Sequence, residues 1–143
     1  MTHSGGREQQ AREDIADVLV RYASGIDRRE WALFRSCFAD GCEVDYGDIG
    51  AWKGADDITE FMRDMHEPLG PTLPRITNQV IELQGDDAAT ARSYVDALVM
   101  GPDGGSANRV AGYYDDGLVR GAEGWKITRR RFTMVHLEMG QGG

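Results

Sequence analysis

Four long extended segments in the second half of the chain constrain the fold more than any other feature. They cover residues 73–84, 88–100, 108–120 and 125–138. The turn signals that separate them are at 85–87, 101–105 and 121–124. This pattern predicts an antiparallel meander of strands that are longer than the usual five or six residues. Strands of that length must twist and coil, so we expect a sheet that curves around a hollow.

The first half of the chain has helical periodicity instead. Apolar side chains within residues 11–26 recur at spacings of three and four, which predicts a helix with one buried stripe. Asp27 and Glu30 resemble a capping box for a second, shorter helix. We expect that second helix to run from Trp31 to Phe38.

A short hairpin and a third helix complete the first half. Residues 42–46 alternate between two faces and precede a turn, so they predict a strand that pairs with a second one at 51–53. Asp57 and Glu60 form another capping pattern, and helical spacing continues to Met65.

The order of these elements predicts one α+β domain. Three N-terminal helices are expected to pack on one face of a strongly curved, mainly antiparallel β-sheet and to close a cone. Such a cone encloses a small-molecule pocket with a mainly apolar lining and a few converging polar groups. We expect the domain to span residues 11–139, between flexible tails at 1–10 and 140–143.

Charge and terminal composition limit the partners. The chain of 143 residues has 16 Lys and Arg against 24 Asp and Glu, a formal net charge of −8. Such a surface repels nucleic-acid phosphates and anionic lipids, so neither nucleic acid nor membrane is an expected partner. The N-terminus lacks the apolar run of a secretory signal, which predicts a cytoplasmic protein. Cys37 and Cys42 are expected to be reduced and packed.

The motifs of cofactor and metal chemistry are missing from the sequence. There is no glycine-rich phosphate loop before a helix, no HExxH, no Gly-x-Ser-x-Gly and no set of spaced metal ligands. The sequence therefore predicts chemistry without a cofactor and without a metal.

Several short motifs in this element order point to a known family. They are Tyr22-Ala23-Ser24-Gly25-Ile26-Asp27, Trp31, Val44-Asp45-Tyr46, Gly124-Trp125-Lys126-Ile127 and a late Arg-Phe pair. On these motifs, residues 11–136 resemble the SnoaL-like family of the NTF2-like superfamily. That superfamily includes scytalone dehydratase, ketosteroid isomerase, hexachlorocyclohexane dehydrochlorinase and bile-acid dehydratase, beside members that only bind or scaffold. The resemblance implies an NTF2-like cone, a hydrophobic ligand and a homodimer formed through the outer sheet face.

The resemblance also assigns candidate catalytic residues. In the eliminating relatives, an aspartate after the first helix pairs with a histidine that removes a proton from carbon. Asp27 matches that aspartate, and Tyr46 matches a tyrosine that polarises the dehydratase substrate. The position aligned with the histidine is Pro74, which cannot accept a proton, and Ile26 replaces the tyrosine before the aspartate. The remaining set is closer to the steroid-isomerase style, in which a carboxylate is the base and hydroxyl groups stabilise an enolate.

Four candidate residues have both a catalytic and a structural interpretation. Asp27 either enters the pocket as a base or caps the second helix. The hydroxyl groups of Tyr22 and Tyr46 either face the cavity or satisfy the core. His66 either acts as acid and base or meets the dipole at a helix C-terminus.

Other residues are candidates for substrate binding. We expect Trp31, on the resemblance, and Tyr94 and Tyr113, on their strand positions, to line the pocket. Arg75 and Asn78 are candidates as well, but they face opposite sides of a regular strand, which leaves open which of the two lines the cavity. Strand alternation places Tyr113 and its neighbour Tyr114 on opposite faces and does not decide between them.

The arginine run near the end of the chain has a structural interpretation. Alternation sends Arg130 to the face opposite Arg129 and Arg131, so we expect pairing across strands with acids rather than an anionic partner. The candidate acids are Asp96, Asp115 and Asp116.

Two functions are consistent with these residues. The first is a cofactor-independent lyase or isomerase that acts on a polycyclic, polyketide-like or steroid-like carbonyl compound, with Asp27 as base and tyrosine hydroxyls at the oxyanion. The alternative, favoured by Pro74, is a non-catalytic module that binds a small molecule or serves as a dimeric scaffold.

Overall fold

The structure is a computed structural model that describes residues 3–140. Its helices are α1 (His3–Asp27), α2 (Trp31–Arg35), the 3-10 helix η1 (Gly47–Ile49) and α3 (Ala55–His66). Its strands are β1 (Phe38–Asp45), β2 (Ala51–Lys53), β3 (Thr72–Leu83), β4 (Ala88–Met100), β5 (Ala107–Gly121) and β6 (Gly124–Glu138).

The six strands form one sheet in the order β2-β1-β6-β5-β4-β3. The meander from β3 to β6 is antiparallel throughout, as predicted, and the observed strand bounds differ from the predicted ones by at most one residue. β1 runs parallel to β6, so the sheet is mixed. β1 and β6 are far apart in the sequence, so the hydrophobic pattern of either segment does not predict that they pair.

The helical half differs from the expectation at its boundaries. α1 begins at His3, so residues 3–10 are helical rather than a flexible tail. Side-chain hydrogen bonds from Gln9 to Glu13 and from Gln10 to Asp14 support this first part of the helix. Residues 1–2 and 141–143 of the expected tails lie outside the described part of the chain.

The predicted capping box and the predicted end of the second helix are wrong. α2 stops at Arg35, and Phe38 begins β1 instead of ending the helix. The N-cap of α2 is Glu30, with no side-chain cap, and Asp27 is the last residue of α1. The chain turns between the two helices through Arg29, whose φ of 55° is left-handed.

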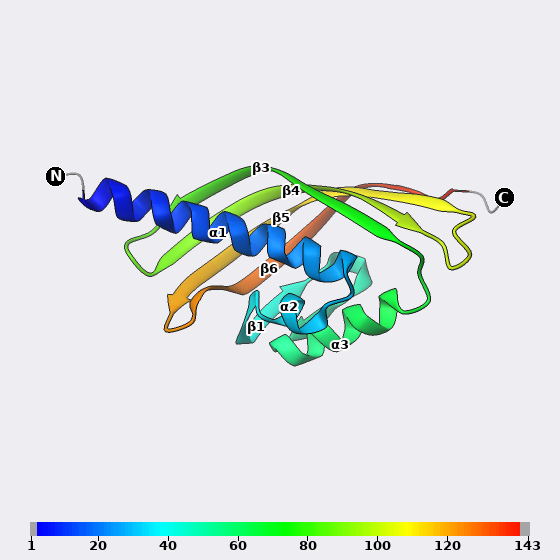
Figure 1. The fold of residues 1–143 in the computed structure, drawn as a ribbon, viewed down its shortest axis with the longest axis horizontal. Coiled ribbons are helices and arrows are strands. Elements are labelled where there is room, and N and C mark those ends of the chain that lie inside the picture. Colours follow the sequence, from blue (N-terminus) through cyan, green and yellow to red (C-terminus); the bar gives the residue numbers. More distant parts are fainter. Residues whose placement is uncertain (1–2, 141–143) are drawn as a thin grey trace.

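All three helices lie on one face of the curved sheet, and the core is between them and the strands (Figure 1). Fully buried side chains come from every layer: Ile15 and Leu19 from α1, Ile58 from α3, and Leu118 and Ile127 from β5 and β6. We call the helix-covered side the inner face and the opposite side the outer face. In Figure 1 the β4–β5 turn and the end of β6 project beyond α3.

Candidate active site

A cavity of about 150 Å³ lies on the inner face, between the helices and strands β3 to β6. Most of its wall is apolar, and one side consists of small or β-branched residues of β4 and β5. These are Val95, Ala97, Val99 and Val110. Such a wall excludes water from whatever binds there, which strengthens every polar interaction inside the cavity.

Two tyrosine hydroxyl groups meet at the cavity. Tyr22, on the buried stripe of α1, and Tyr46, directly after β1, place their Oη atoms 2.5 Å apart. Both side chains are buried and line the cavity. Burial raises the pKa of each phenol above its ordinary value, so both hydroxyls stay protonated at neutral pH. The hydroxyl pair can therefore donate to an oxygen atom of a ligand.

A buried ion pair lies behind these tyrosines. Arg130 donates two hydrogen bonds to Asp116, at 2.7 and 2.9 Å, and both side chains are buried. The guanidinium carbon of Arg130 is 4.3 Å from the ring centre of Tyr22 and 3.9 Å from that of Tyr114. Arg130 thus stacks on two tyrosines as a cation–π partner. Its charge lowers the pKa of Tyr22 and Tyr46, although the effect of burial is larger.

His66 lines the same cavity from the end of α3. Its Nδ1 is 2.7 Å from the carbonyl oxygen of Met62, an arrangement in which Nδ1–H donates and Nε2 keeps its lone pair. Burial lowers the pKa of His66, and the hydrogen bond to Met62 only partly opposes this effect. The imidazole is therefore neutral at pH 7 and able to accept a proton.

Asp27 lies at the edge of this cavity and is not among the residues that line it. Its carboxylate is half-buried, and Oδ1 is buried without a hydrogen-bond partner. Burial raises the pKa of Asp27, while the positive charge of Arg29 opposes the shift. Arg29 itself holds three acceptors: the carbonyl oxygens of Ile26 and Gly70 and the hydroxyl of Thr72. Asp27 is thus a weaker acid than an exposed aspartate, and it lies outside the lining of the cavity.

The structure contradicts the predicted cavity positions of Arg75, Tyr94 and Tyr113. Their strands present them on the outer face, where Arg75 pairs with Asp96 at 2.9 Å and Arg92 stacks on Tyr113 at 4.4 Å. The inner positions on these strands belong to Pro74 and Tyr114, which line the cavity. Sequence alternation fixes which residues share a face, but the side on which the helices pack is a tertiary property.

Two further predicted residues also lie outside the cavity lining. Asn78 has a φ of 50° within a β-bulge between Thr77 and Val80, and its side chain is exposed. Trp31 is half-buried, and its ring centre is 5.9 Å from that of His66. Trp31 therefore packs against a cavity residue rather than against the ligand space.

Some features of the cavity and of its surroundings were not predicted from the sequence. Arg130 was expected to pair with an acid, and the pair with Asp116 is confirmed, but its stacking beneath the tyrosines was not foreseen. The methionines of the lining, among them Met62 and Met134, carry no chemical motif. The helical spacing of the third helix predicts that Met62 is buried, and Met134 has no signal beyond an apolar position in a strand.

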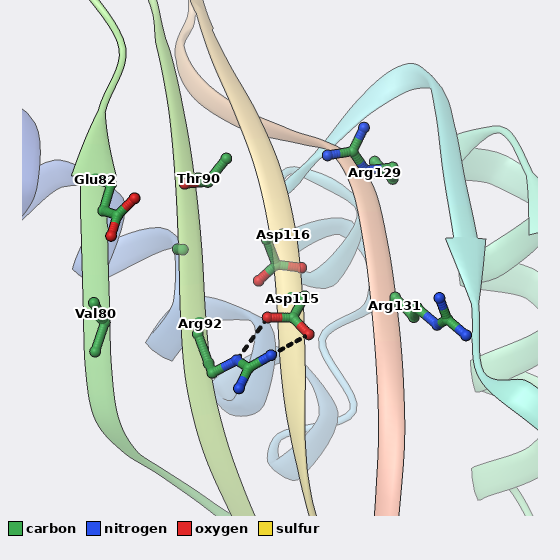
Figure 2. A pocket seen from close by; sticks show the side chains of 9 residues that line it. Val80, Glu82, Thr90, Arg92, Asp115, Asp116, Arg129 and Arg131 are labelled. Atoms are coloured by element: carbon green, nitrogen blue, oxygen red, sulfur yellow. Dashed lines mark hydrogen bonds and ion pairs between the residues drawn. The ribbon is translucent and has the colours of Figure 1, made fainter.

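A wider hollow of about 530 Å³ lies on the outer face. Figure 2 shows Arg92 from β4 meeting Asp115 from β5, with hydrogen bonds of 2.7 and 3.0 Å. Arg129 and Arg131 project from β6 beside them. These side chains are largely exposed, so water screens their charges. The smaller inner cavity is the better site for chemistry that requires a dry environment.

Residues 3–140 include no helix that is long and apolar enough to cross a membrane. The same range contains no group of three or more His, Cys, Asp or Glu side chains that could hold a metal ion.

A family model, a protein sequence and solved structures are similar to this chain. The SnoaL-like domain matches residues 7–131. An uncharacterized protein of Mycobacterium tuberculosis (strain H37Rv) is 26% identical over 129 residues, which cover 90% of this chain and 88% of that protein. The crystal structure of the Kfla4162 protein from Kribbella flavida is similar, with a TM-score of 0.84 and 26% identity over 92% of this chain and 95% of that chain.

The fold is also similar to that of an enzyme, at lower sequence identity. The hexachlorocyclohexane dehydrochlorinase LinA-type3 from Novosphingobium barchaimii has a TM-score of 0.85 and 20% identity, over 96% of this chain and 94% of that chain. Three helices on a six-stranded, mainly antiparallel sheet are common to this α+β NTF2-like fold. The chain belongs to the SnoaL-like family.

Proposed function

We propose that the protein is a cofactor-independent lyase or isomerase that removes a proton from carbon next to the carbonyl group of a hydrophobic small molecule. One observation carries the proposal. A hydrogen-bonded pair of tyrosine hydroxyls and a neutral histidine lie on the same apolar cavity. This combination provides an oxyanion stabiliser and a base in one dry space.

The first chemical step would use His66 as the base. Its Nε2 accepts the proton from the α-carbon, the C–H electron pair forms a carbon–carbon double bond, and the carbonyl π electrons move to oxygen. The Tyr22–Tyr46 pair donates to this enolate oxygen, and the Arg130 cation stacked on Tyr22 favours negative charge nearby. The protein would thereby stabilise the enolate more than the ketone.

The second step decides between the two reaction classes. In an isomerisation of a β,γ-unsaturated ketone, the enolate is a dienolate. The His66 imidazolium then returns the proton to the γ-carbon, the double bond moves to the α,β position, and the carbonyl reforms. In an elimination, the carbonyl reforms as a leaving group departs from the β-carbon, and the imidazolium protonates that group. Asp27, with its raised pKa and unpartnered Oδ1, is the alternative base.

Hydrogen–deuterium exchange on a cyclic ketone tests this proposal without knowledge of the product. With cyclohexanone, a one-ring ketone, in D₂O, the protein should accelerate deuterium incorporation at the α-carbons, measured by NMR. His66→Gln should reduce the rate about 10²-fold or more, the range of general-base catalysis. The matched control is His136→Gln, an exposed histidine far along β6.

Three results of this exchange experiment are decisive. Exchange that His66→Gln leaves intact and Asp27→Asn abolishes would transfer the role of base to Asp27. Exchange no faster than in buffer would overturn the catalytic proposal. A rate that both histidine variants lower equally would assign the effect to nonspecific surface catalysis.

A non-catalytic binding module is the second candidate function. Pro74 lines the cavity at the position where the resemblance places the dyad histidine. A proline there keeps the apolar wall and removes a proton acceptor. Tight binding of a cyclic ketone without proton exchange would favour this function.

We also propose a homodimer formed through the outer sheet face. Helices leave this face uncovered, and it carries the exposed side chains of Leu73, Val80 and Tyr94. Charges alternate across it, because Arg92 pairs with Asp115 and the register places Asp115 opposite Arg131. In a two-fold symmetric dimer, the positive side chains on this face of one copy can therefore meet the negative side chains of the other.

Sedimentation velocity tests the dimer. The wild-type chain should sediment as two copies, and Tyr94→Glu should shift the mass toward one copy. Val20→Glu, an equally drastic change at an exposed position of α1, should leave the mass unchanged. A monomeric wild-type protein at micromolar concentration would contradict the proposal.

A further inference from the structure

The cavity opens to solvent on one side, and its volume is too small to surround a polycyclic ligand completely. Its volume of about 150 Å³ equals that of an engineered apolar cavity that accommodates benzene. Drug-sized ligands occupy pockets of about 300–1,000 Å³. One ring with a polar substituent therefore fills the space beside the Tyr22–Tyr46 pair, and any larger ligand must extend beyond the mouth.

The mouth of the cavity is rimmed by exposed apolar side chains. Ile49 from η1, Met65 from α3 and Met134 from β6 all line the cavity, and all three are exposed. Methionine side chains are flexible and adapt to ligands of different shape. Covering such a rim with an apolar group removes its side chains from water, which is favourable.

The sheet extends this rim beyond the helices. Leu137 is opposite Val110 in the β5–β6 register, and Val110 lines the cavity, so Leu137 lies on the same inner face. Leu137 is exposed because this end of the sheet projects past α3 (Figure 1). We define Ile49, Met65, Met134 and Leu137 as the apolar track.

We propose that the ligand is amphipathic: one polar ring fills the cavity, and an apolar extension lies along the apolar track. This inference rests on the proposed function, because it assigns the substrate class of the same cavity. The track is continuous with the cavity and contains no charged member, so the natural occupant is the remainder of the bound molecule. The Tyr22–Tyr46 hydroxyls orient the polar end inward, and the tail then points outward.

Isothermal titration calorimetry with phenol, 4-propylphenol and 4-hexylphenol tests this inference. Each methylene group fully buried on the track would tighten binding about fourfold, and partial burial about twofold. Leu137→Gln should reduce the gain per methylene group and leave the affinity for phenol unchanged. The matched control is Leu73→Gln, because Leu73 is 49% exposed and Leu137 is 48% exposed, while Leu73 lies on the outer face.

The outcomes separate the two proposals. If Tyr46→Phe weakens phenol binding but chain length has no effect, the track is wrong and the polar cavity stands. If chain length matters and Tyr46→Phe has no effect, the track stands and the proposed site does not. Equal effects of Leu137→Gln and Leu73→Gln, or no binding of any phenol, would overturn the inference. A wild-type dimer that Leu137→Gln dissociates would assign the track to a second copy and overturn it as well.

Discussion

Position 74 carries a proline on the cavity wall, while the imidazole comes from His66 at the end of α3. His66 approaches the ligand from α3, whereas a histidine at position 74 would approach it from β3. His66 can therefore remove the α-proton only if that proton faces α3. The sequence identified His66 as the one mid-chain histidine, but its cavity position depends on how α3 packs. The hydrogen bond from His66 Nδ1 to Met62 then determines which nitrogen is free.

Strand alternation correctly predicts which neighbouring residues lie on opposite faces of the sheet. It does not predict which of the two faces the helices cover. It separated Tyr113 from Tyr114 and Arg130 from its neighbours, as observed. It could not indicate that Tyr114 is inside and Tyr113 outside, because the covering helices decide this. The stacking of Arg130 on Tyr22 joins β6 to α1, a contact that no local pattern contains.

Asp116 and Asp115 provide a matched comparison of buried and exposed ion pairs. Asp116→Asn leaves the buried Arg130 charge uncompensated and should lower the free energy of unfolding by about 3–5 kcal/mol. Asp115→Asn breaks an exposed pair with Arg92 and should cost under about 1 kcal/mol. Urea denaturation measures both changes, and equal losses would show that burial does not distinguish the pairs.

Asp27→Asn should raise the melting temperature at pH 7. The pKa of Asp27 is raised in the folded state, so the folded protein binds the proton more tightly, and its stability falls as pH rises above the ordinary value of 3.8. Removing the charge abolishes this penalty at neutral pH and gains nothing at pH 3. Thermal scans at both pH values test the sign, with Asp17→Asn on the exposed side of α1 as control. A lower melting temperature at pH 7 would contradict the buried carboxylate.

At the scale of elements, the four long strands were predictable, whereas the end of α2 and the start of β1 were not: the pattern predicts a strand at 42–46, and β1 begins at Phe38. Glycine- and aspartate-rich turns bound each long strand, so their limits follow from local chemistry. Phe38 was assigned to a helix because aromatic residues fit either periodicity over a short stretch. It belongs to β1 because that strand pairs with β6, near Ile127.

Two glycines of α1 should respond oppositely to alanine. A Cβ at Gly25 would lie 2.8 Å from the backbone nitrogen of Phe34, so Gly25→Ala should cost about 1–3 kcal/mol by forcing α1 and α2 apart. Gly6 has no neighbouring atoms within 4 Å, and Gly6→Ala should strengthen the helix by up to about 1 kcal/mol. Unfolding titrations and hydrogen exchange of the α1 amides give both signs. A gain at Gly25 would mean that the two helices are not in close contact.

At the scale of the whole molecule, the fold separates a dry inner face from a charged outer face. The inner face carries the cavity and the buried Arg130, and the outer face carries the exposed pair of Arg92 and Asp115. This division explains why a strongly acidic chain can present an apolar ligand site. Because His66 lines the cavity, protonation of its imidazole also changes the stability of the whole fold.

His66 should make the folded state sensitive to mild acid. Its pKa is lowered on folding, so the unfolded chain binds protons more tightly, and stability is lost as pH falls below the ordinary value of 6.5. The free energy of unfolding should therefore decrease from pH 7 to pH 5 in the wild type. His66→Gln should flatten this dependence.

The most direct test of a neutral, cavity-facing base is an NMR titration of the protein labelled with ¹⁵N-histidine. Our account predicts that the His66 signal titrates below pH 6.5 and that its neutral ring carries the proton on Nδ1. His66→Gln assigns the signal by removing it. A pKa above 6.5 would contradict the buried, neutral imidazole. A neutral ring protonated on Nε2 would leave that nitrogen without a lone pair for the substrate proton, and would also contradict the account.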